Sequence, residues 1–346
     1  MKKKAILAVV AVFLMSVFLV GCGGKKEQPQ APQAGAKQEV ITIKLAHTSA
    51  EGTTIYKTYD KFKELLEKNS NGKLKVEVFP ASALGGDQAL VEGAKRGSID
   101  IGSCGTNNLS QFSNLYLWAD LPYVFKNLDG VHKVYGGPIG EEMKKKFEEE
   151  QKDLVVLFYA DPGSFRNFMN TKREVKTPED AKGLKMRTAA SPVEQAIVRA
   201  FGSAPTPVSW PEVYMALEQK VVDGELQQYH WIVTAKHQEI IRHVSEIGGQ
   251  HALHLAVLSK KTWDKLTPEL QKVVMDAAKE AQKYNFDNAE KFNNDLRQEV
   301  IKAGVKIYNP TPEEMKLWEQ AGQKVWDEYK DKVPRELIDR VRKAQE

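Results

Sequence analysis

The sequence predicts an α/β protein, because segments with a period of two alternate along the chain with segments of helical period. In residues 53–73, apolar side chains from Tyr56 to Leu66 share one helical face, and residues 85–97 predict a second helix capped by Asp87. Strands are expected at residues 40–47, 73–80, 98–104 and 153–160. Strands and helices joined by short connections are typical of βαβ units, in which helices cover a largely parallel sheet.

A second series of the same kind begins near Gly163. Strands are expected at residues 166–170, 185–189, 205–208 and 221–227. Thr177, Ser191 and Ser209 each stand three positions before an acidic residue, which predicts three helix starts in this region. Pro192 occupies the first helical position of the second helix, where proline is favourable.

The third part of the chain contains the longest predicted helix. A strand is expected at residues 251–259, and a helical pattern then runs from Thr267 to about Ala303. A helix of this length exceeds what one small domain usually contains. We therefore expect it to bridge two domains.

The N-terminus has the anatomy of a signal peptide. Three lysines precede an unbroken apolar run of sixteen residues from Ala5 to Val20, which is short for a membrane-spanning helix. The run ends in LVGC, which resembles the lipobox of bacterial lipoproteins and implies cleavage before Cys22 and acylation of its thiol. Residues 1–21 are then the signal peptide. Residues 22–38, rich in Gln, Pro and Ala, form a flexible tether.

Charge and cysteine content exclude several kinds of protein. Loss of residues 1–21 removes three of the 50 basic side chains and none of the 46 acidic ones, so the remaining chain is close to neutral. Nucleic-acid binding normally needs a basic surface, so no nucleic-acid partner is expected. After lipidation of Cys22, only Cys104 remains free, and no internal disulfide can form.

Arg187 is the first candidate site residue that the pattern itself suggests. It lies at the end of the strand expected at residues 185–189, just before the helix that Ser191 begins. Open α/β sheets place their ligand sites at the carboxyl ends of strands, beside helix N-termini. The alternative interpretation is a solvated or salt-bridged surface arginine.

Motifs for catalysis or cofactor binding are absent from the sequence. It contains no G-x-S-x-G elbow, H-E-x-x-H motif, P-loop or G-x-G-x-x-G loop. His251 and His254 are expected on opposite faces of one strand, so a metal ion shared by both is not predicted. We expect no metal site, no cofactor and no enzymatic activity. A secreted α/β hydrolase or lyase remains the alternative, because catalytic residues need not be local in sequence.

An ordered set of motifs resembles the solute-binding subunits of TRAP transporters, known as the DctP family. The segments are FPASALGGDQALVEGAKRGSIDIG, LPYVFKN, GSFRNFMNTKREVKTPEDAKGLKMR, GSAPTPVSWPEVYMALEQKVVDGE and HLAVLSKKTWDKLTPELQKVV. The resemblance extends from about Glu39 to the C-terminus. These subunits belong to tripartite, ATP-independent carriers with two membrane subunits, one small and one large.

The resemblance implies a two-domain fold like that of class II periplasmic binding proteins, with crossing hinge strands and one long helix spanning both domains. Domain I is expected to contain residues 39–162 and about 251–290. Domain II is expected to contain residues 163–250 and about 291–346. The domains of such a protein close on a ligand that lies between them.

The resemblance also assigns roles to residues of the cleft. Arg187, in the Gly-Leu-Lys-x-Arg motif, is expected to pair with a ligand carboxylate, and its planar guanidinium suits that task. Arg166 is either a second arginine near the ligand or part of a hinge salt bridge. Trp210 lines the pocket or covers a helix start. Gln227 occupies a position where many members carry asparagine, within Asp-Gly-Glu-Leu-Gln-Gln instead of Asp-Gly-Gln-Glu-Asn-Pro.

Further residues are expected to face the cleft from turns and strand ends. Cys104 is expected as a packed side chain there rather than a nucleophile, because nothing nearby in the sequence stabilises a thiolate. The histidine at position 254 is either a ligand contact or a packed core residue. The complete set of these candidates is His47, Thr48, Cys104, Asn107, Tyr229 and His254.

These residues imply a small organic anion as ligand. A dicarboxylate, a keto or hydroxy acid and an aromatic acid suit the arginines and aromatic side chains comparably well. The predicted protein is a monomer held by the Cys22 lipid at the periplasmic or extracytoplasmic face of the cell membrane. It delivers its ligand to a TRAP permease, or serves as the binding subunit of another transport or signalling system.

Overall fold

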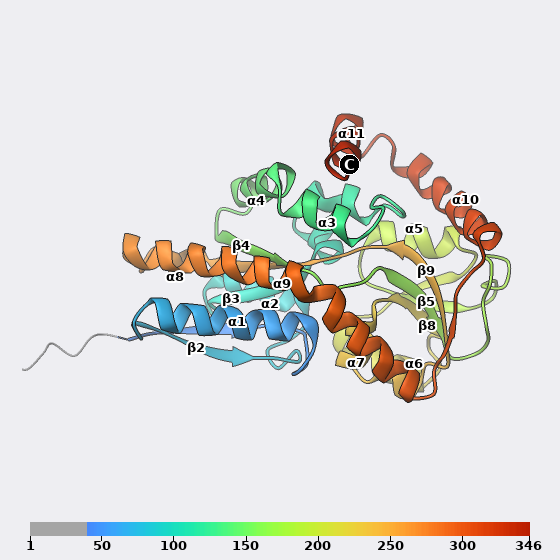
Figure 1. Ribbon diagram of the computed structural model, residues 1–346, viewed down its shortest axis with the longest axis horizontal. Coiled ribbons are helices and arrows are strands. Elements are labelled where there is room, and N and C mark those ends of the chain that lie inside the picture. Colours follow the sequence, from blue (N-terminus) through green and yellow to red (C-terminus); the bar gives the residue numbers. More distant parts are fainter. Residues whose placement is uncertain (1–39) are drawn as a thin grey trace, which may run out of the picture. The chain divides into compact units, whose positions relative to one another are not determined.

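The computed structural model describes residues 40–346, and its strands form two separate β-sheets (Figure 1). The predicted signal peptide, the lipidated Cys22 and the tether lie outside the described residues. Within residues 40–346, no helix is both long enough and apolar enough to cross a membrane. The α/β class predicted from the sequence is confirmed.

The first sheet has the strand order β2-β1-β3-β10-β4. Its strands are β1 (Ile41–Ala46), β2 (Leu74–Phe79), β3 (Ile101–Gly105), β4 (Leu154–Ala160) and β10 (His254–Ser259). Strand β1 is parallel to β2 and β3, whereas β10 returns antiparallel between β3 and β4. Its helical elements are α1 (Thr54–Asn69), α2 (Asp87–Arg96), η1 (Thr106–Gln111), η2 (Asn114–Asp120), α3 (Leu128–Tyr135), α4 (Pro138–Glu150) and α8 (Lys260–Trp263).

The second sheet has the order β11-β9-β5-β8-β6-β7. Its strands are β5 (Arg166–Asn170), β6 (Lys185–Thr188), β7 (Ala204–Pro207), β8 (Gly224–Gln227), β9 (His243–Gln250) and β11 (Lys306–Tyr308). Strand β6 is parallel to both β7 and β8, and β5 is antiparallel to β8 and β9. The accompanying helical elements are α5 (Pro192–Ala200), η3 (Trp210–Glu212), α6 (Val213–Glu218), α7 (Tyr229–Thr234), η4 (His237–Glu239) and α10 (Pro312–Tyr329). The last helix, α11 (Arg335–Ala344), returns to the first sheet's helices and packs against α3.

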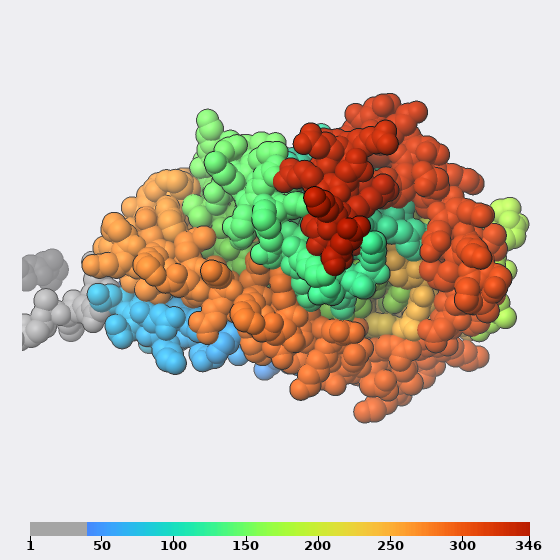
Figure 2. Space-filling view, turned by 45° about the horizontal axis from the view of Figure 1, so that its top comes forward, coloured from blue at the N-terminus to red at the C-terminus, as the bar shows by residue number. Residues whose placement is uncertain are grey.

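Two short segments carry the chain from one sheet to the other, residues 161–165 after β4 and residues 251–253 before β10, and a long helix makes a third passage from β10 to β11. Helix α9 (Pro268–Lys302) runs along both sheets, and Figure 2 shows it as a continuous orange band on the surface. Its Val274 packs into the core of the first sheet, and its Val300 packs into a core of the second. The predicted bridging helix is confirmed, within one residue of its predicted ends.

The predicted domain boundaries remain a prediction, because residues 39–346 form one compact unit. Buried apolar side chains fill the space on both faces of each sheet. Burial of such side chains is the main favourable contribution to folding, and here it also fixes the two strand crossings at the centre of the molecule.

Two predicted helix starts are wrong in detail. Thr177 does not begin a helix, because the carboxylate of Asp180 accepts hydrogen bonds from the backbone N–H groups of Lys176 and Thr177 and closes a turn that leads directly into β6. Asp87 does not cap α2 either. Gly86 is the N-cap residue, and Asp87 is the first residue of the helix.

The predicted strand at residues 251–259 is shorter than expected. Strand β10 begins at His254, and His251 lies in the crossing segment that precedes it. The two histidines therefore do not share one strand. His251 is fully buried beside Asp161, at the point where the two crossing segments meet.

Gly163, in the first crossing segment, tests how tightly α9 holds that crossing. Its φ is +93°, and a Cβ there would lie 2.1 Å from the backbone oxygen of Ala289 in α9. Gly304 is the matched control, with φ +87° and no atom within 4 Å of the added Cβ. Both alanine variants carry the left-handed backbone penalty, so Gly163→Ala is expected to unfold more easily than Gly304→Ala by about 2 kcal/mol. Urea denaturation measures the difference, and equal losses would show that the crossing can move away from α9.

Candidate functional site

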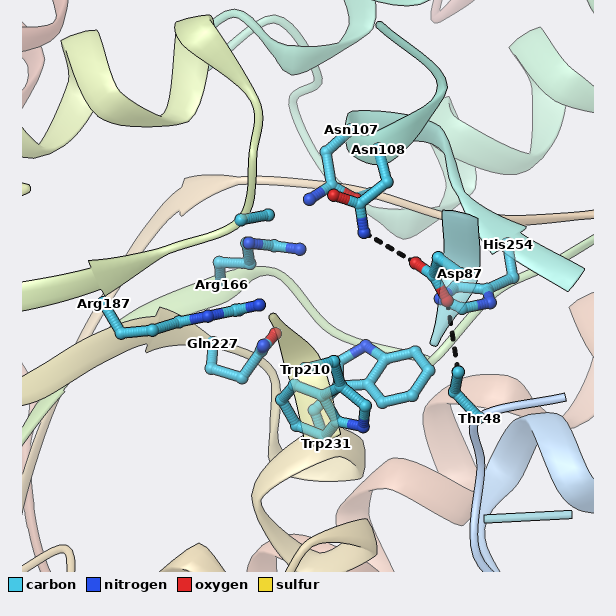
Figure 3. A pocket seen from close by; sticks show the side chains of 12 residues that line it. Thr48, Asp87, Asn107, Asn108, Arg166, Arg187, Trp210, Gln227, Trp231 and His254 are labelled. Atoms are coloured by element: carbon cyan, nitrogen blue, oxygen red, sulfur yellow. Dashed lines mark hydrogen bonds between the residues drawn. The ribbon is translucent and has the colours of Figure 1, made fainter. Parts of the chain in front are cut away.

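A cavity lies between the two sheets, where strands of both end (Figure 3). Thr48 follows the end of β1, Asn107 and Asn108 follow β3, and Arg187 belongs to β6. The full lining is Thr48, Asp87, Asn107, Asn108, Arg166, Arg187, Ala189, Trp210, Gln227, Trp231, Ala252 and His254. The carboxyl ends of parallel strands are the usual place for a ligand site in such folds.

Arg187 extends from β6 toward the centre of this cavity (Figure 3). Its side chain is 3 % exposed, and its Nε donates a hydrogen bond to the Val208 backbone oxygen at 3.1 Å. The ring of Trp210 lies 5.6 Å from its Cζ atom. These contacts orient the guanidinium plane. Within residues 40–346, neither Nη atom forms a hydrogen bond, and no carboxylate lies within salt-bridge distance of Arg187.

Burial lowers the pKa of Arg187, while the nearby carboxylates of Glu194 and Glu225 raise it. An arginine stays charged in spite of such a shift, because its ordinary pKa is so high. Isolated buried charges are unfavourable unless they are paired. The arrangement is therefore that of a cation prepared for an anion from outside the described chain.

Arg166, at the start of β5, is already paired. Its Nη1 lies 3.1 Å from Oε1 of Glu194, and both side chains are almost completely buried. Oε2 of Glu194 accepts a hydrogen bond from Nδ2 of Asn107 at 3.2 Å. Because Asn107 follows β3 and Glu194 belongs to α5, the hydrogen bond between Asn107 and Glu194 links the elements of the two sheets. Arg166 thus lines the cavity and also forms a buried salt bridge with Glu194 within the second domain, and only the hydrogen bond from Asn107 to Glu194 reaches the first.

Aromatic rings form one wall of the cavity. Trp210 and Trp231 meet edge to face with ring centroids 5.3 Å apart, and the His254 ring lies 4.6 Å from Trp231. Burial lowers the pKa of His254, so its imidazole is neutral near neutral pH. Gln227, at the end of β8, accepts a hydrogen bond from the Gln228 backbone N–H at 3.1 Å. Its amide nitrogen is thereby left toward the cavity.

Asp87 lies on the side of the cavity opposite Arg187 (Figure 3). Its Oδ2 accepts hydrogen bonds from the Gly105 backbone N–H at 3.1 Å and from Nδ2 of Asn108 at 2.6 Å. Its Oδ1 accepts only a long one, from the Thr48 hydroxyl at 3.4 Å. The first turn of a helix is favourable for a carboxylate, because the helix dipole is positive there.

Three predicted site residues lie outside this lining. His47 stacks on Tyr59 at 4.7 Å, and burial lowers its pKa to about 3. Cys104 is fully buried in a hydrophobic core and burial raises its pKa, so it is a packed side chain. The hydroxyl of Tyr229 donates to Glu246 at 2.6 Å in a separate surface groove. A role for these three in ligand binding finds no support in the cavity.

The structure brings seven of the ten predicted residues together at the cavity: Arg187, Arg166, Gln227, Trp210, Thr48, Asn107 and His254. Asp87, Asn108 and Trp231 were missed. Asp87 stands where a helix cap was expected, and Trp231 is only two residues after the predicted Tyr229. The adjacent Asn107-Asn108 pair in one turn was a signal that both side chains serve the same site.

A wider groove of about 890 Å³ continues outward from the cavity. Asp87, Asn108, Arg187, Ala189 and Trp210 line both spaces, so the cavity opens along α2 and β7. Within residues 40–346, no group of three or more His, Cys, Asp and Glu side chains is arranged to hold a metal ion.

Residues 45–332 match the family profile DctP, described as bacterial extracellular solute-binding protein, family 7. The chain is 33 % identical over 275 residues to the 2,3-diketo-L-gulonate-binding periplasmic protein YiaO of Escherichia coli, covering 79 % of this chain and 82 % of that protein. It is 30 % identical to the C4-dicarboxylate-binding periplasmic protein DctP of Rhodobacter capsulatus, over 89 % and 92 % of the two chains. The chain therefore belongs to the DctP family of solute-binding proteins.

Solved structures agree with this assignment. A TRAP periplasmic solute-binding protein from Sulfurospirillum deleyianum with bound succinate matches with a TM-score of 0.82 and 29 % identity, over 87 % of this chain and 98 % of that chain. The sugar-acid-binding protein DctPAm from Advenella mimigardefordensis, in complex with galactonate, matches with a TM-score of 0.84 and 25 % identity. The match covers 89 % of this chain and 98 % of that chain. The two-domain periplasmic-binding-protein fold is thus confirmed, and these relatives are transport proteins rather than enzymes.

Asp120 lies beside the Arg166–Glu194 pair and gives a pH-dependent prediction. Ser191 donates to its Oδ2 at 3.1 Å, and its Oδ1 is buried without a partner among the described residues. Burial raises the pKa of Asp120 to about 8, with Arg166 opposing and Glu194 reinforcing the shift. Between the ordinary pKa and about 8, the folded state binds a proton that the unfolded state releases.

The free energy of unfolding should therefore fall as pH rises through this window, by at most about 1.4 kcal/mol per pH unit from this group. Asp120→Asn mimics the neutral acid and should lack this contribution, so its stability relative to the wild type should increase from pH 5 to pH 8. Urea denaturation at several pH values measures this, with the exposed Asp331→Asn as the control. A constant difference between wild type and Asp120→Asn would contradict the assignment.

Proposed function

We propose that this protein captures a small organic carboxylate between its two domains, with the carboxylate paired to the guanidinium of Arg187. The observation that carries the proposal is a buried, oriented arginine with no carboxylate partner among residues 40–346, in a cavity at the strand ends. The relatives that bind succinate, galactonate and diketogulonate support the ligand class, because all three ligands are organic acids.

The magnitudes are consistent with a reversible carrier. Micromolar affinity corresponds to about −8 kcal/mol. A hydrogen bond to a charged group contributes roughly 1.5–3 kcal/mol, and a guanidinium offers two parallel ones to a carboxylate. Pairing at Arg187 thus supplies a large part of the required free energy. Contacts with Trp210, Gln227 and the opposite domain supply the remainder, against the cost of ordering the ligand.

Delivery to a membrane permease completes the proposed function. Family membership supports a TRAP permease of one small and one large membrane subunit as the partner. The LVGC sequence before Cys22 supports a lipid anchor at the extracytoplasmic face of the membrane. The protein then binds its ligand outside the cell membrane, and the permease performs the transport step.

Arg187→Ala is expected to weaken binding of the preferred acid by about 2–4 kcal/mol, because truncation leaves the ligand carboxylate buried without a partner. The variant should melt near the wild-type temperature, since Arg187 has no salt bridge to lose within the described residues. Arg187→Lys keeps the charge without the planar guanidinium and should bind more weakly than wild type.

Isothermal titration calorimetry with a panel of small organic acids measures these effects. Arg199→Ala is the matched control, because Arg199 is an exposed arginine beside Glu328 and far from the cavity lining. Unchanged affinity of Arg187→Ala for the acid that wild type prefers would sink the proposed function.

Cys22→Ser tests the membrane attachment. Without the thiol, the precursor should be neither acylated nor processed, because the lipid is attached to that sulfur. Metabolic labelling with a radioactive fatty acid, followed by fractionation of the cells, reports both steps. Lipid-labelled protein in the membranes of cells that express only Cys22→Ser would contradict the proposal.

A further inference from the structure

The polar groups that line the cavity are divided by type between its two sides. The side formed by the second sheet presents donors: the guanidinium of Arg187 and the amide nitrogen of Gln227, whose oxygen is occupied by the Gln228 N–H. Arg166 adds a second guanidinium on this side. A carboxylate accepts hydrogen bonds and donates none, so it fits this side alone.

The opposite side, from the first sheet, presents acceptors. Asn107 donates its Nδ2 to Glu194, and Asn108 donates its Nδ2 to Asp87, so both amide oxygens are left as acceptors. Asp87 contributes a full carboxylate, and the long contact of its Oδ1 with Thr48 leaves that atom able to accept a shorter hydrogen bond.

Polar atoms of three residues surround the space above Gly105. A Cβ built on Gly105 would lie 2.6 Å from Oδ1 of Asn107, 3.3 Å from Nε2 of His254 and 3.4 Å from Oδ2 of Asp87. The absence of a side chain at this glycine therefore keeps the polar atoms accessible. A ligand group that donates hydrogen bonds, such as a hydroxyl, is matched to the acceptors on this side.

We infer that the preferred ligand is a hydroxylated monocarboxylate, whose carboxylate pairs with Arg187 and whose distal hydroxyl donates to Asp87. This inference rests on the proposed function and adds the class of acid. Asp87 is then a specificity residue, because a second carboxylate at the same position would meet a like charge. The relatives do not decide the matter, since their names include both succinate and galactonate.

An amine is a less suitable distal group than a hydroxyl. An ammonium carries a full charge that must be desolvated, and its attraction to Asp87 is opposed by the unpaired Arg187 in the same cavity. A hydroxyl can donate to Asp87 and at the same time accept from a neighbouring group such as the Thr48 hydroxyl. The acceptor side therefore favours alcohols.

Three acids that differ only at the far end of a four-carbon chain test the inference on the wild-type protein. These are γ-hydroxybutyrate, succinate and γ-aminobutyrate, and calorimetry gives their dissociation constants. We expect γ-hydroxybutyrate to bind at least about ten times more tightly than either of the others. Gluconate and glucarate, which differ only in a terminal hydroxymethyl or carboxylate group, repeat the comparison with a longer, polyhydroxylated chain.

Asp87→Asn should invert the preference. The amide oxygen can take the place of Oδ2 and accept from Gly105 and Asn108. The amide NH₂ then occupies the position of Oδ1, so a donor faces the cavity where the wild type has an acceptor. Binding of γ-hydroxybutyrate should weaken about tenfold, and binding of succinate should strengthen. Glu92→Gln is the matched control, because Glu92 lies on the same helix and lines only the outer groove.

The outcomes separate this inference from the proposed function. If none of the acids binds the wild type, the proposed function fails, and this inference fails with it. If succinate or γ-aminobutyrate binds as tightly as γ-hydroxybutyrate, and glucarate as tightly as gluconate, only the inference is overturned. An equal loss for all acids in Asp87→Asn would likewise assign Asp87 a structural role. The wild-type comparison decides the question even where that variant does not fold.

Discussion

The cleft depends on one buried guanidinium that the described chain leaves without a counterion. Arg187 is held by the Val208 carbonyl and the Trp210 ring, and both contacts leave its Nη atoms directed into the cavity. Burial lowers the pKa of Arg187, and the nearby carboxylates of Glu194 and Glu225 raise it. Such a charge is tolerated because an anion from outside can complete it.

The second arginine shows how the structure separates two tasks. Arg166 is neutralised by Glu194, and Glu194 also receives Asn107 from the opposite sheet. Glu194 therefore links the two sides of the cleft through its hydrogen bond with Asn107, whereas Arg187 has no such partner among the described residues. Two arginines with similar burial differ in role because only one has a carboxylate within reach.

Ligand choice within this family cannot come from the fold, because relatives with the same architecture bind different acids. It must come from the side chains opposite the arginine. In the binding proposed above, the Asp87 carboxylate and two asparagine oxygens would present acceptors to the far end of the ligand. Hydrogen-bond donors therefore lie on one side of the cavity and acceptors on the other, so the two ends of a bound molecule would meet different groups.

The sequence by itself determined the α/β class and the long helix α9, and it selected Arg187, which lines the cavity, because each leaves a local mark in periodicity, capping or motif. Tertiary structure decided the rest of the site. Asp87 resembled a helix cap, yet its carboxylate contacts Gly105 and Asn108 from another element. Tyr229 and Trp231 are neighbours in sequence, but only Trp231 faces the cavity. Periodicity reports which face of an element is buried, whereas contacts between distant elements depend on how the two sheets pack.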